Sequence, residues 1–200
     1  MVYIPGLKEL WTVWKVLEGK SLARFGDGEL LILSSQDSRT QAWSKKLEDE
    51  LRHVLHNSEC VVGVPHDRGV RSDYWKSFLS AYQCWYGEKA SSFISRPDEV
   101  PMVGQAGFQL FIKQIWKDRD VTLVGSGSSL TRDHMEGAKS VTLVNIPDQN
   151  AYSHIDDIED MIGEPKLTIL CAGPTATCLA NRLTRKGLWA VDLGYAGRFM

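Results

Sequence analysis

The sequence predicts an α/β fold in which helices cover both faces of a mostly parallel sheet. Short apolar runs alternate with stretches of helical periodicity, most regularly after residue 120. The runs are apolar at successive positions, which is typical of strands that are covered on both sides. With 200 residues, 43% of them hydrophobic and 24% charged, the chain is long enough for one core, and we expect one domain over residues 1–200.

The first half of the chain is expected to contain several helices and two short strands. Apolar residues at helical spacing between residues 7 and 17 predict a helix that packs on the core through its tryptophans and ends at Gly19. A strand at residues 21–25 follows, and a second helix begins near Glu29. The other expected elements are a helix with its apolar face at residues 43–55, a strand at 60–64 and two aromatic-rich helices at 73–85 and 108–116.

The second half alternates strands and helices regularly. Strands are expected at residues 121–124, 141–144, 167–170 and 189–192, and helices at 151–162 and 174–183. The candidate functional motifs of the chain each fall just after a strand. Parallel sheets bind ligands at the carboxyl ends of their strands, so this placement predicts a binding cleft along that edge.

The first motif is Arg24-Phe25-Gly26-Asp27-Gly28-Glu29, where two carboxylates flank a glycine. Asp27 and Glu29 can both turn toward one hard cation, and magnesium or manganese keeps positions open for phosphate oxygens. Arg24 can clamp a phosphate or hold a carboxylate through a two-pronged hydrogen bond. A solvated turn in which Asp27 caps the next helix is the competing interpretation, and spacing alone leaves both open.

Three further junctions are candidates for contact with a nucleotide. At Gly125-Ser126-Gly127-Ser128, small residues let backbone N–H groups approach a phosphate. A nicotinamide dinucleotide is not expected there, because Leu130 replaces the third glycine of the dinucleotide fingerprint. Gly173-Pro174-Thr175 opens a helix whose N-terminus can meet a phosphate, and Asn150 begins another helix. Each junction has an alternative interpretation without a ligand. Gly125–Ser128 could be a tight turn, Gly173–Thr175 could simply begin a helix, and Asn150 could be an N-cap.

Composition and spacing exclude several functions. The net charge is −2 and the pI about 6.2, without a run of Lys and Arg, which argues against tight non-specific binding of nucleic acid. The cysteines form no C-x-x-C pair, and the histidines show no zinc spacing. Neither a Gly-x-Ser-x-Gly motif nor a Ser-His-Asp order is present. Without a signal peptide or a membrane-length apolar run, we expect a reduced, cytoplasmic, soluble protein.

Four motifs in register resemble those of the GT-D glycosyltransferases, the family once labelled DUF1792. They are the segment from Arg24 to Glu29, the stretch from Asn145 to Tyr152, Ala172-Gly173-Pro174-Thr175-Ala176-Thr177, and Ala190-Val191-Asp192-Leu193-Gly194. The resemblance extends in order from about residue 20 to 195. It implies a Rossmann-like fold of the GT-D type and the transfer of a sugar from a nucleotide donor, typically a uridine diphosphate (UDP) sugar.

The resemblance also implies roles for individual residues. Asp27 and Glu29 would serve a divalent metal, manganese or magnesium. In the mechanism that we expect, this metal bridges the donor's two phosphates and Arg24 adds positive charge beside it. The backbone at Gly26, Gly125–Ser128, Asn150 and Gly173–Thr175 would lie against the nucleotide. Candidates for the catalytic base are Asp192, Asp67 and His66. In this chain Tyr195 replaces the histidine that usually follows the last motif.

The acceptor and two rival functions stay open at this point. A surface glycan or glycoprotein is one acceptor class, and a hydroxymethylated DNA base is the other, for which Lys45, Lys46, Arg52, Arg68 and Arg71 offer a basic face if they converge. One rival is a methyltransferase that binds S-adenosylmethionine through Gly125–Leu130. The other is a nucleotide-binding module without catalytic activity.

Overall fold

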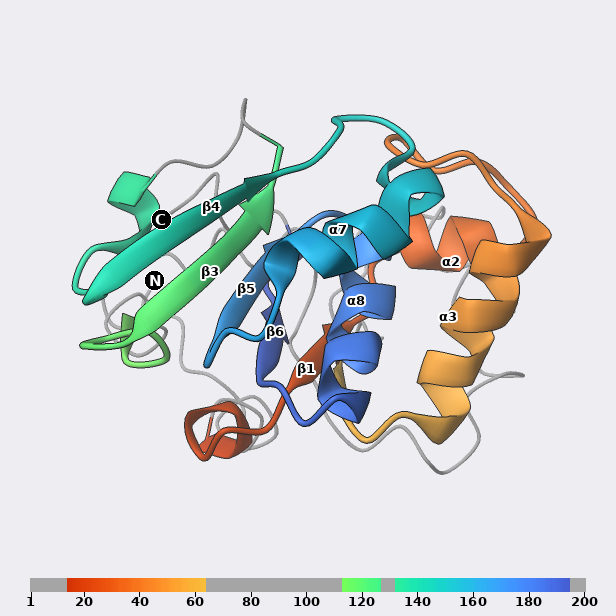
Figure 1. Ribbon diagram of the computed structural model, residues 1–200. Coiled ribbons are helices and arrows are strands. Elements are labelled where there is room, and N and C mark those ends of the chain that lie inside the picture. The colour runs from red at the N-terminus through yellow and green to blue at the C-terminus, as the bar shows by residue number, and fades with distance from the viewer. Residues whose placement is uncertain (1–13, 64–112, 127–131, 195–200) are drawn as a thin grey trace, which may run out of the picture.

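Six parallel strands form one sheet in the computed structural model of the chain, which describes residues 14–63, 113–126 and 132–194. The strand order is β2-β1-β6-β5-β3-β4, and every pairing is parallel (Figure 1). The strands are β1 (Leu22–Arg24), β2 (Val61–Gly63), β3 (Asp120–Gly125), β4 (Ser140–Asn145), β5 (Thr168–Cys171) and β6 (Ala190–Asp192). The predicted α/β class with a parallel sheet is confirmed.

Helices connect these strands. The α-helices labelled in Figure 1 are α2 (Asp27–Leu33), α3 (Lys45–Asn57), α7 (Ile155–Ile162) and α8 (Pro174–Arg185), and two 3-10 segments are η3 (Arg132–Met135) and η4 (Ala151–His154). Residues 14–17 form the end of a further helix. Gly19 ends it as predicted, with a φ of 88° and its N–H donated to the carbonyl of Val16 at 2.9 Å.

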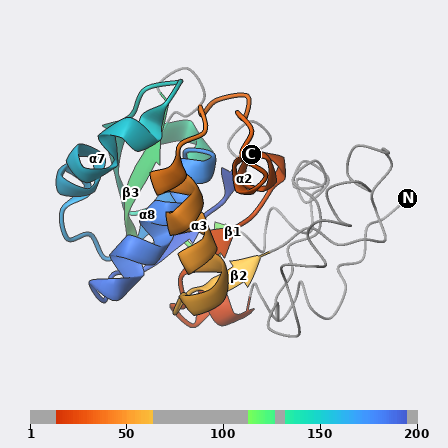
Figure 2. The same ribbon diagram turned by 90° about the vertical axis from the view of Figure 1, so that its right-hand side faces the viewer.

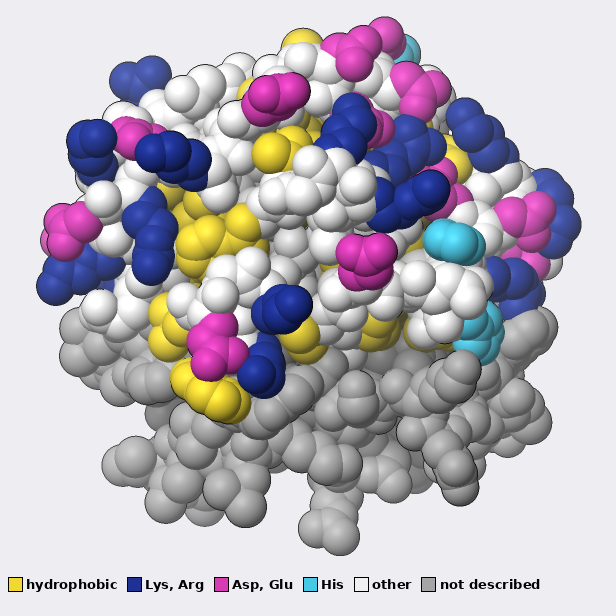
Figure 3. Space-filling view, turned by 60° about the horizontal axis from the view of Figure 1, so that its bottom comes forward, with side chains coloured by type: hydrophobic (Ala, Val, Ile, Leu, Met, Phe, Trp, Pro, Cys, Tyr) yellow, Lys and Arg dark blue, Asp and Glu magenta, His cyan; other side chains and the backbone are white. Residues whose placement is uncertain are grey.

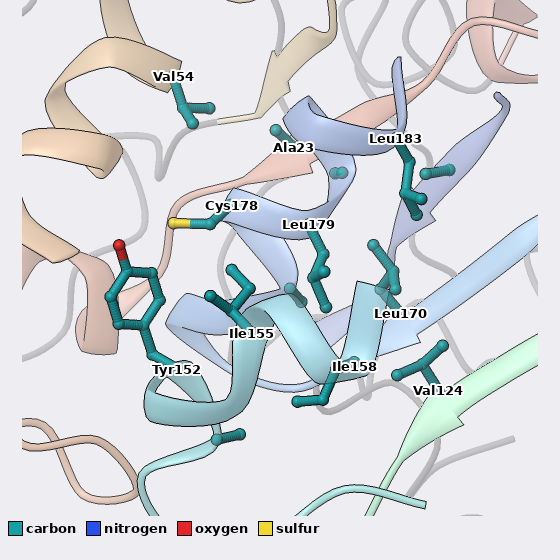
Figure 4. Close-up of a cluster of buried hydrophobic side chains, with 14 of the residues drawn as sticks. Ala23, Val54, Val124, Tyr152, Ile155, Ile158, Leu170, Cys178, Leu179 and Leu183 are labelled. Atoms are coloured by element: carbon teal, nitrogen blue, oxygen red, sulfur yellow. The ribbon is translucent and has the colours of Figure 1, made fainter. Parts of the chain in front are cut away.

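Strands β1, β3, β5 and β6 are largely buried, and their successive side chains point to opposite faces of the sheet. The edge strand β4 is mostly exposed, so the expectation of cover on both sides is wrong for this strand. In β1, Leu22 joins a cluster with Val16 and Trp116 on one face, whereas Ala23 joins the larger cluster on the other. This larger cluster lies under α3, α8 and α7, with α8 in contact with both of the other helices (Figure 2). Figure 4 shows side chains of α7, α8 and the strands meeting there.

An ion-pair network ties the three helices together at their outer surface. Arg182 of α8 donates to both carboxylate oxygens of Glu50 in α3, at 2.5 and 2.9 Å, and to Asp156 of α7 at 2.6 Å. The Tyr152 hydroxyl donates to Glu50 at 2.6 Å. The network fixes α8, whose first turn belongs to the candidate site described below.

Four sequence expectations need correction. The helix after the first motif begins at Asp27 rather than near Glu29, and the segment predicted as one helix from residue 151 begins with a 3-10 turn. Trp43 precedes α3 and is 38% exposed, and Trp14 is 52% exposed with Lys15 over its ring, so neither tryptophan is a core residue.

The helix predicted at residues 73–85 and most of the one at 108–116 lie outside the described residues. Within the described part of the chain, no helix is both long and apolar enough to cross a membrane.

Candidate active site

The carboxyl ends of the central strands bring three of the sequence motifs into contact. A side-chain carbon placed on Gly28 would lie 3.3 Å from Cγ of Pro174, so the start of α2 packs against the start of α8. Thr177 of α8 donates its hydroxyl to the carbonyl of Arg24 at 2.8 Å. The backbone N–H of Arg24 in turn donates to Oδ2 of Asp192 at 3.2 Å. The ends of β1 and β6 and the first turns of α2 and α8 thus form one continuous group.

The first turn of α2 directs its two carboxylates to different places. Glu29 is buried, and its Oε2 accepts the N–H of Gly26 at 2.6 Å, which satisfies a free donor at the helix start. Asp27 is exposed, and its Oδ1 accepts the N–H of Gly28 at 2.9 Å. Residues two apart on a helix do not share a face. Asp27 therefore faces solvent and Glu29 faces the interior.

Glu29 and Asp192 form a buried acidic pair. Burial raises the pKa of Glu29 to about 7, and the charge of Asp192 adds to the rise. Burial also raises the pKa of Asp192 to about 6, against the opposing effect of Arg24. The Thr177 hydroxyl lies 3.2 Å from Oδ2 of Asp192 and 3.4 Å from Oε1 of Glu29. At neutral pH the pair therefore carries fewer than two negative charges.

The Arg24 side chain is buried close to this acidic pair. Its side chain is 8% exposed and lies against Gly194, where an added side-chain carbon would overlap the guanidinium group. Gly194 has a φ of 55°, and its N–H donates to Oδ1 of Asp192 at 2.9 Å. The positive charge of Arg24 lowers the pKa of both acids. Among the described residues, no hydrogen bond or ion pair joins the Arg24 guanidinium to a carboxylate, so the geometry does not decide between the two roles that the sequence allowed for it.

A segment that the sequence analysis did not include completes this edge. Residues 34–44, which join α2 to α3, carry Thr40, whose Oγ1 lies 3.2 Å from the position of a side-chain carbon on Gly173. Asn150 holds the segment: its side-chain oxygen accepts the N–H of Ala42 at 2.7 Å, and its own N–H donates to the carbonyl of Thr40 at 2.8 Å. Asn150 occupies the N-cap position of η4 as expected, but its side chain makes no cap bond there and binds Ala42 instead. The backbone of Asn150 is left-handed, with a φ of 56°, which Asn tolerates better than most residues. The Asn at this position was the sequence signal for such a turn, and the sequence analysis did not use it.

The remaining candidate residues lie along the same edge or outside the described residues. Gly125 ends β3 in register with Cys171 of β5, and Ser126 follows it. Gly173 has a φ of 54° and precedes α8, where Thr175 is fully buried and its hydroxyl has no hydrogen-bond partner among the described residues. The candidates outside the described residues are Gly127, Ser128, His66, Asp67 and Tyr195, together with Arg68 and Arg71 of the predicted basic face.

A family model described as the glycosyltransferase GT-D fold matches residues 22–198. The chain belongs to this family. The match includes the motif at Arg24, the start of α8 and the end of β6, and it confirms the resemblance inferred from the four motifs. It also argues against a methyltransferase.

Two curated relatives of this GT-D chain carry glycosyltransferase names. The probable glycosyl transferase Gly of Streptococcus gordonii is 29% identical over 208 residues, which cover 89% of this chain and 30% of that protein. The glycosyltransferase GlyD of Streptococcus pneumoniae serotype 4 is 27% identical over 221 residues, covering 98% of this chain and 27% of that protein. The GT-D chain thus spans less than a third of the length of these relatives.

Solved structures share the fold. One, described as a new glycosyltransferase (DUF1792) from Streptococcus sanguinis, superimposes with a TM-score of 0.79 at 22% identity, covering 92% of this chain and 79% of that one. A second, described as the domain of unknown function 1792 with a distinct glycosyltransferase fold, gives a TM-score of 0.77 at 22% identity and covers 92% and 77%. At this identity the likeness establishes the fold of the GT-D chain.

The side chains at this edge fit a divalent metal through Asp27. Among the described residues, no three His, Cys, Asp or Glu side chains are grouped to enclose a metal ion. Magnesium is commonly held by one or two carboxylates together with water and substrate phosphates, so a closed cage is not required. Asp27 offers an exposed carboxylate with one intramolecular bond, whereas the carboxylate of Glu29 is buried and bonded to Gly26.

Proposed function

We propose that the chain is a single metal-dependent glycosyltransferase domain over residues 1–200, which transfers a sugar from a UDP sugar to an acceptor hydroxyl. The observation that carries the proposal is the meeting of three motifs at one edge of a parallel sheet, in a chain of the GT-D family. That edge is where open α/β sheets bind their ligands.

Asp27 and Glu29 are the residues that would serve a magnesium or manganese ion. Such an ion, when bound, supplies a Lewis acid that stabilises the charge on the departing diphosphate. Asp27 has the exposed carboxylate for it. Glu29 would serve the ion indirectly: its carboxylate is buried and accepts the N–H of Gly26, so it fixes the turn on which Asp27 lies.

The start of α8 offers a place for the donor phosphates. Gly173 has no side chain to block a ligand, and the dipole of α8 favours negative charge at the helix N-terminus. Gly125–Ser128 and Asn150 would line the same edge. Among the described residues, Asp192 is the candidate for the base that an inverting transfer would need. Its raised pKa suits a proton acceptor, whereas its buried carboxylate, which accepts the N–H groups of Arg24 and Gly194, favours a structural role.

A glycan or glycoprotein is the acceptor class that the charge distribution favours over DNA. Of the candidate basic face, Lys45 pairs with Asp49 at 2.8 Å and Arg52 pairs with Glu48 at 2.7 Å. On the face that Figure 3 shows, basic and acidic side chains of the described residues are interspersed. A surface of mixed sign gives DNA little electrostatic attraction.

Thermal denaturation with UDP and manganese, separately and together, tests the proposal. We expect a stabilisation with both present that exceeds the sum of the separate effects, because the metal and the diphosphate bind each other in the site. Asp27→Asn should lose this excess stabilisation. Asp160→Asn is the control, because it changes another exposed carboxylate, which lies on α7, and it should keep the excess. Hydrolysis of UDP sugars then measures turnover. An unchanged excess in folded Asp27→Asn protein would show that Asp27 does not serve the metal.

A further inference from the structure

Arg39 lies in the segment between α2 and α3, next to the two glycines of the candidate site. Cβ of Ser38 is 3.7 Å from the position of a side-chain carbon on Gly28, and Oγ1 of Thr40 is 3.2 Å from that on Gly173. The chain at Arg39 therefore passes from the start of α2 to the start of α8. These are the two turns that the proposed function assigns to the metal and to the donor phosphates.

The turn that carries Arg39 is held in one conformation. The N–H of Ser38 donates to the carbonyl of Gln41 at 2.8 Å, and the N–H of Gln41 donates to the hydroxyl of Ser38 at 3.0 Å. The side-chain oxygen of Gln41 accepts the N–H of Tyr152 at 3.0 Å, which fixes the turn to η4. A turn that is ordered before binding loses little conformational entropy when a ligand arrives.

The charge of Arg39 is not used within the described structure. Its side chain is exposed, and no carboxylate of the described residues lies within ion-pair distance of it. Arg52 and Arg182, in contrast, pair with glutamates at 2.7 and 2.5 Å. Arg24, the arginine of the first motif, is buried against Gly194 beside the acidic pair. Arg39 thus supplies a cation at this edge that remains free for a ligand.

We infer that Arg39 binds the diphosphate of the nucleotide donor, an inference that rests on the proposed function. Its planar guanidinium can donate two parallel hydrogen bonds to phosphate oxygens. The phosphates develop their greatest negative charge as the sugar departs, so a cation held in place beside them stabilises the transition state more than the ground state. Arg39 is then a catalytic residue that none of the four sequence motifs contains.

Calorimetric titration of Arg39→Ala and Arg39→Lys with UDP, UMP and uridine tests this role. Arg185→Ala is the matched control, because Arg185 is also exposed and lies at the opposite end of α8. We expect Arg39→Ala to weaken UDP binding roughly tenfold or more, as for the loss of a charge-assisted hydrogen bond. Its affinity for uridine should not change. Arg39→Lys should recover part of the UDP affinity, and Arg185→Ala should match the wild type.

Each outcome supports or refutes a distinct statement. If the wild type fails to bind UDP with or without manganese, the proposed function is wrong and this inference with it. If the wild type binds UDP and Arg39→Ala binds it equally well, only the inference about Arg39 is wrong. Equal losses for UDP and uridine would also overturn it, because they would indicate a contact with the nucleoside. Since Arg39 has no charge partner in the described structure, we expect its variants to melt at the wild-type temperature.

Discussion

Removing the hydroxyl of Thr177 should destabilise the protein, whereas removing that of Thr175 should not. Both residues lie in α8 and are 0% exposed. The Thr177 hydroxyl donates to the carbonyl of Arg24 at 2.8 Å and lies 3.2 Å from Asp192, whereas the Thr175 hydroxyl has no partner in the part of the chain that the structure describes. Thr→Val keeps the shape of the side chain and deletes only the polar group, so the two variants differ in hydrogen bonding alone.

The expected magnitude follows from the groups left behind. Thr177→Val leaves a buried carbonyl and a buried carboxyl without their donor, which costs about 1–3 kcal/mol. For a chain of this size that corresponds to a fall in melting temperature of roughly 4–8 °C at 2 kcal/mol. Thr175→Val deletes a buried, unbonded hydroxyl, so its free energy of unfolding should stay equal or rise by about 1 kcal/mol.

Urea denaturation followed by tryptophan fluorescence measures both values, and the chain has seven tryptophans. A lower midpoint at unchanged slope for Thr177→Val alone would support the hydrogen-bond assignment. Equal losses in the two variants would refute it, because they would mean that any Val at the start of α8 is poorly accommodated.

Three further predictions concern the same group of residues and its support. The pKa of Asp192 is about 6 in the folded protein against an ordinary 3.8, so this residue stabilises the fold at low pH. This contribution of about 3 kcal/mol is lost as the pH rises from about 4 to above 6. Asp192→Asn should therefore flatten the fall of the free energy of unfolding with pH, measured by urea titrations at several pH values. Arg182→Ala removes the cation that pairs with Glu50, which keeps only its bond from Tyr152, and should lower the free energy of unfolding by about 1.5–3 kcal/mol. Arg185→Ala should cause little loss, and equal losses would contradict a special role for the network. Gly194→Ala should cost about 1–3 kcal/mol because its left-handed backbone and the overlap with Arg24 both oppose a side chain; a wild-type melting temperature would contradict this.

The sheet could be predicted from the sequence because its signals are local. Apolar runs at residues 121–124 and 167–170 identify strands that are covered on both faces, and a glycine such as Gly19 marks a helix end. The meeting of the motifs also follows, since the carboxyl ends of parallel strands share one edge. Asn150 and the segment at residues 38–44 could not be paired in this way. The bond between Asn150 and Ala42 spans 108 positions, and no local pattern records it.

The orientation of the two motif acids depended on where α2 begins. If residues 27–29 were extended, Asp27 and Glu29 would point to the same side, as residues two apart do in a strand. Because α2 begins at Asp27, the two positions fall on different faces of a helix. A shift of two residues in a helix start, well within the uncertainty of any sequence-based boundary, thus separates a paired metal site from one exposed and one buried carboxylate.

This separation changes how the charge at the site has to be balanced. Arg24 lies with two buried acids whose raised pKa values show that its charge only partly offsets their burial and mutual repulsion. It therefore has little positive charge to offer a diphosphate outside. The charge of a bound donor must be met by groups on the outer side of the turn, and the described residues offer an ion held by Asp27, the N-terminus of α8 and the guanidinium of Arg39. It follows that Arg24→Lys should reduce stability more than UDP affinity and Arg39→Lys the reverse, and a comparison of melting temperatures with UDP dissociation constants for these two variants decides whether the inner and outer arginines have separate roles.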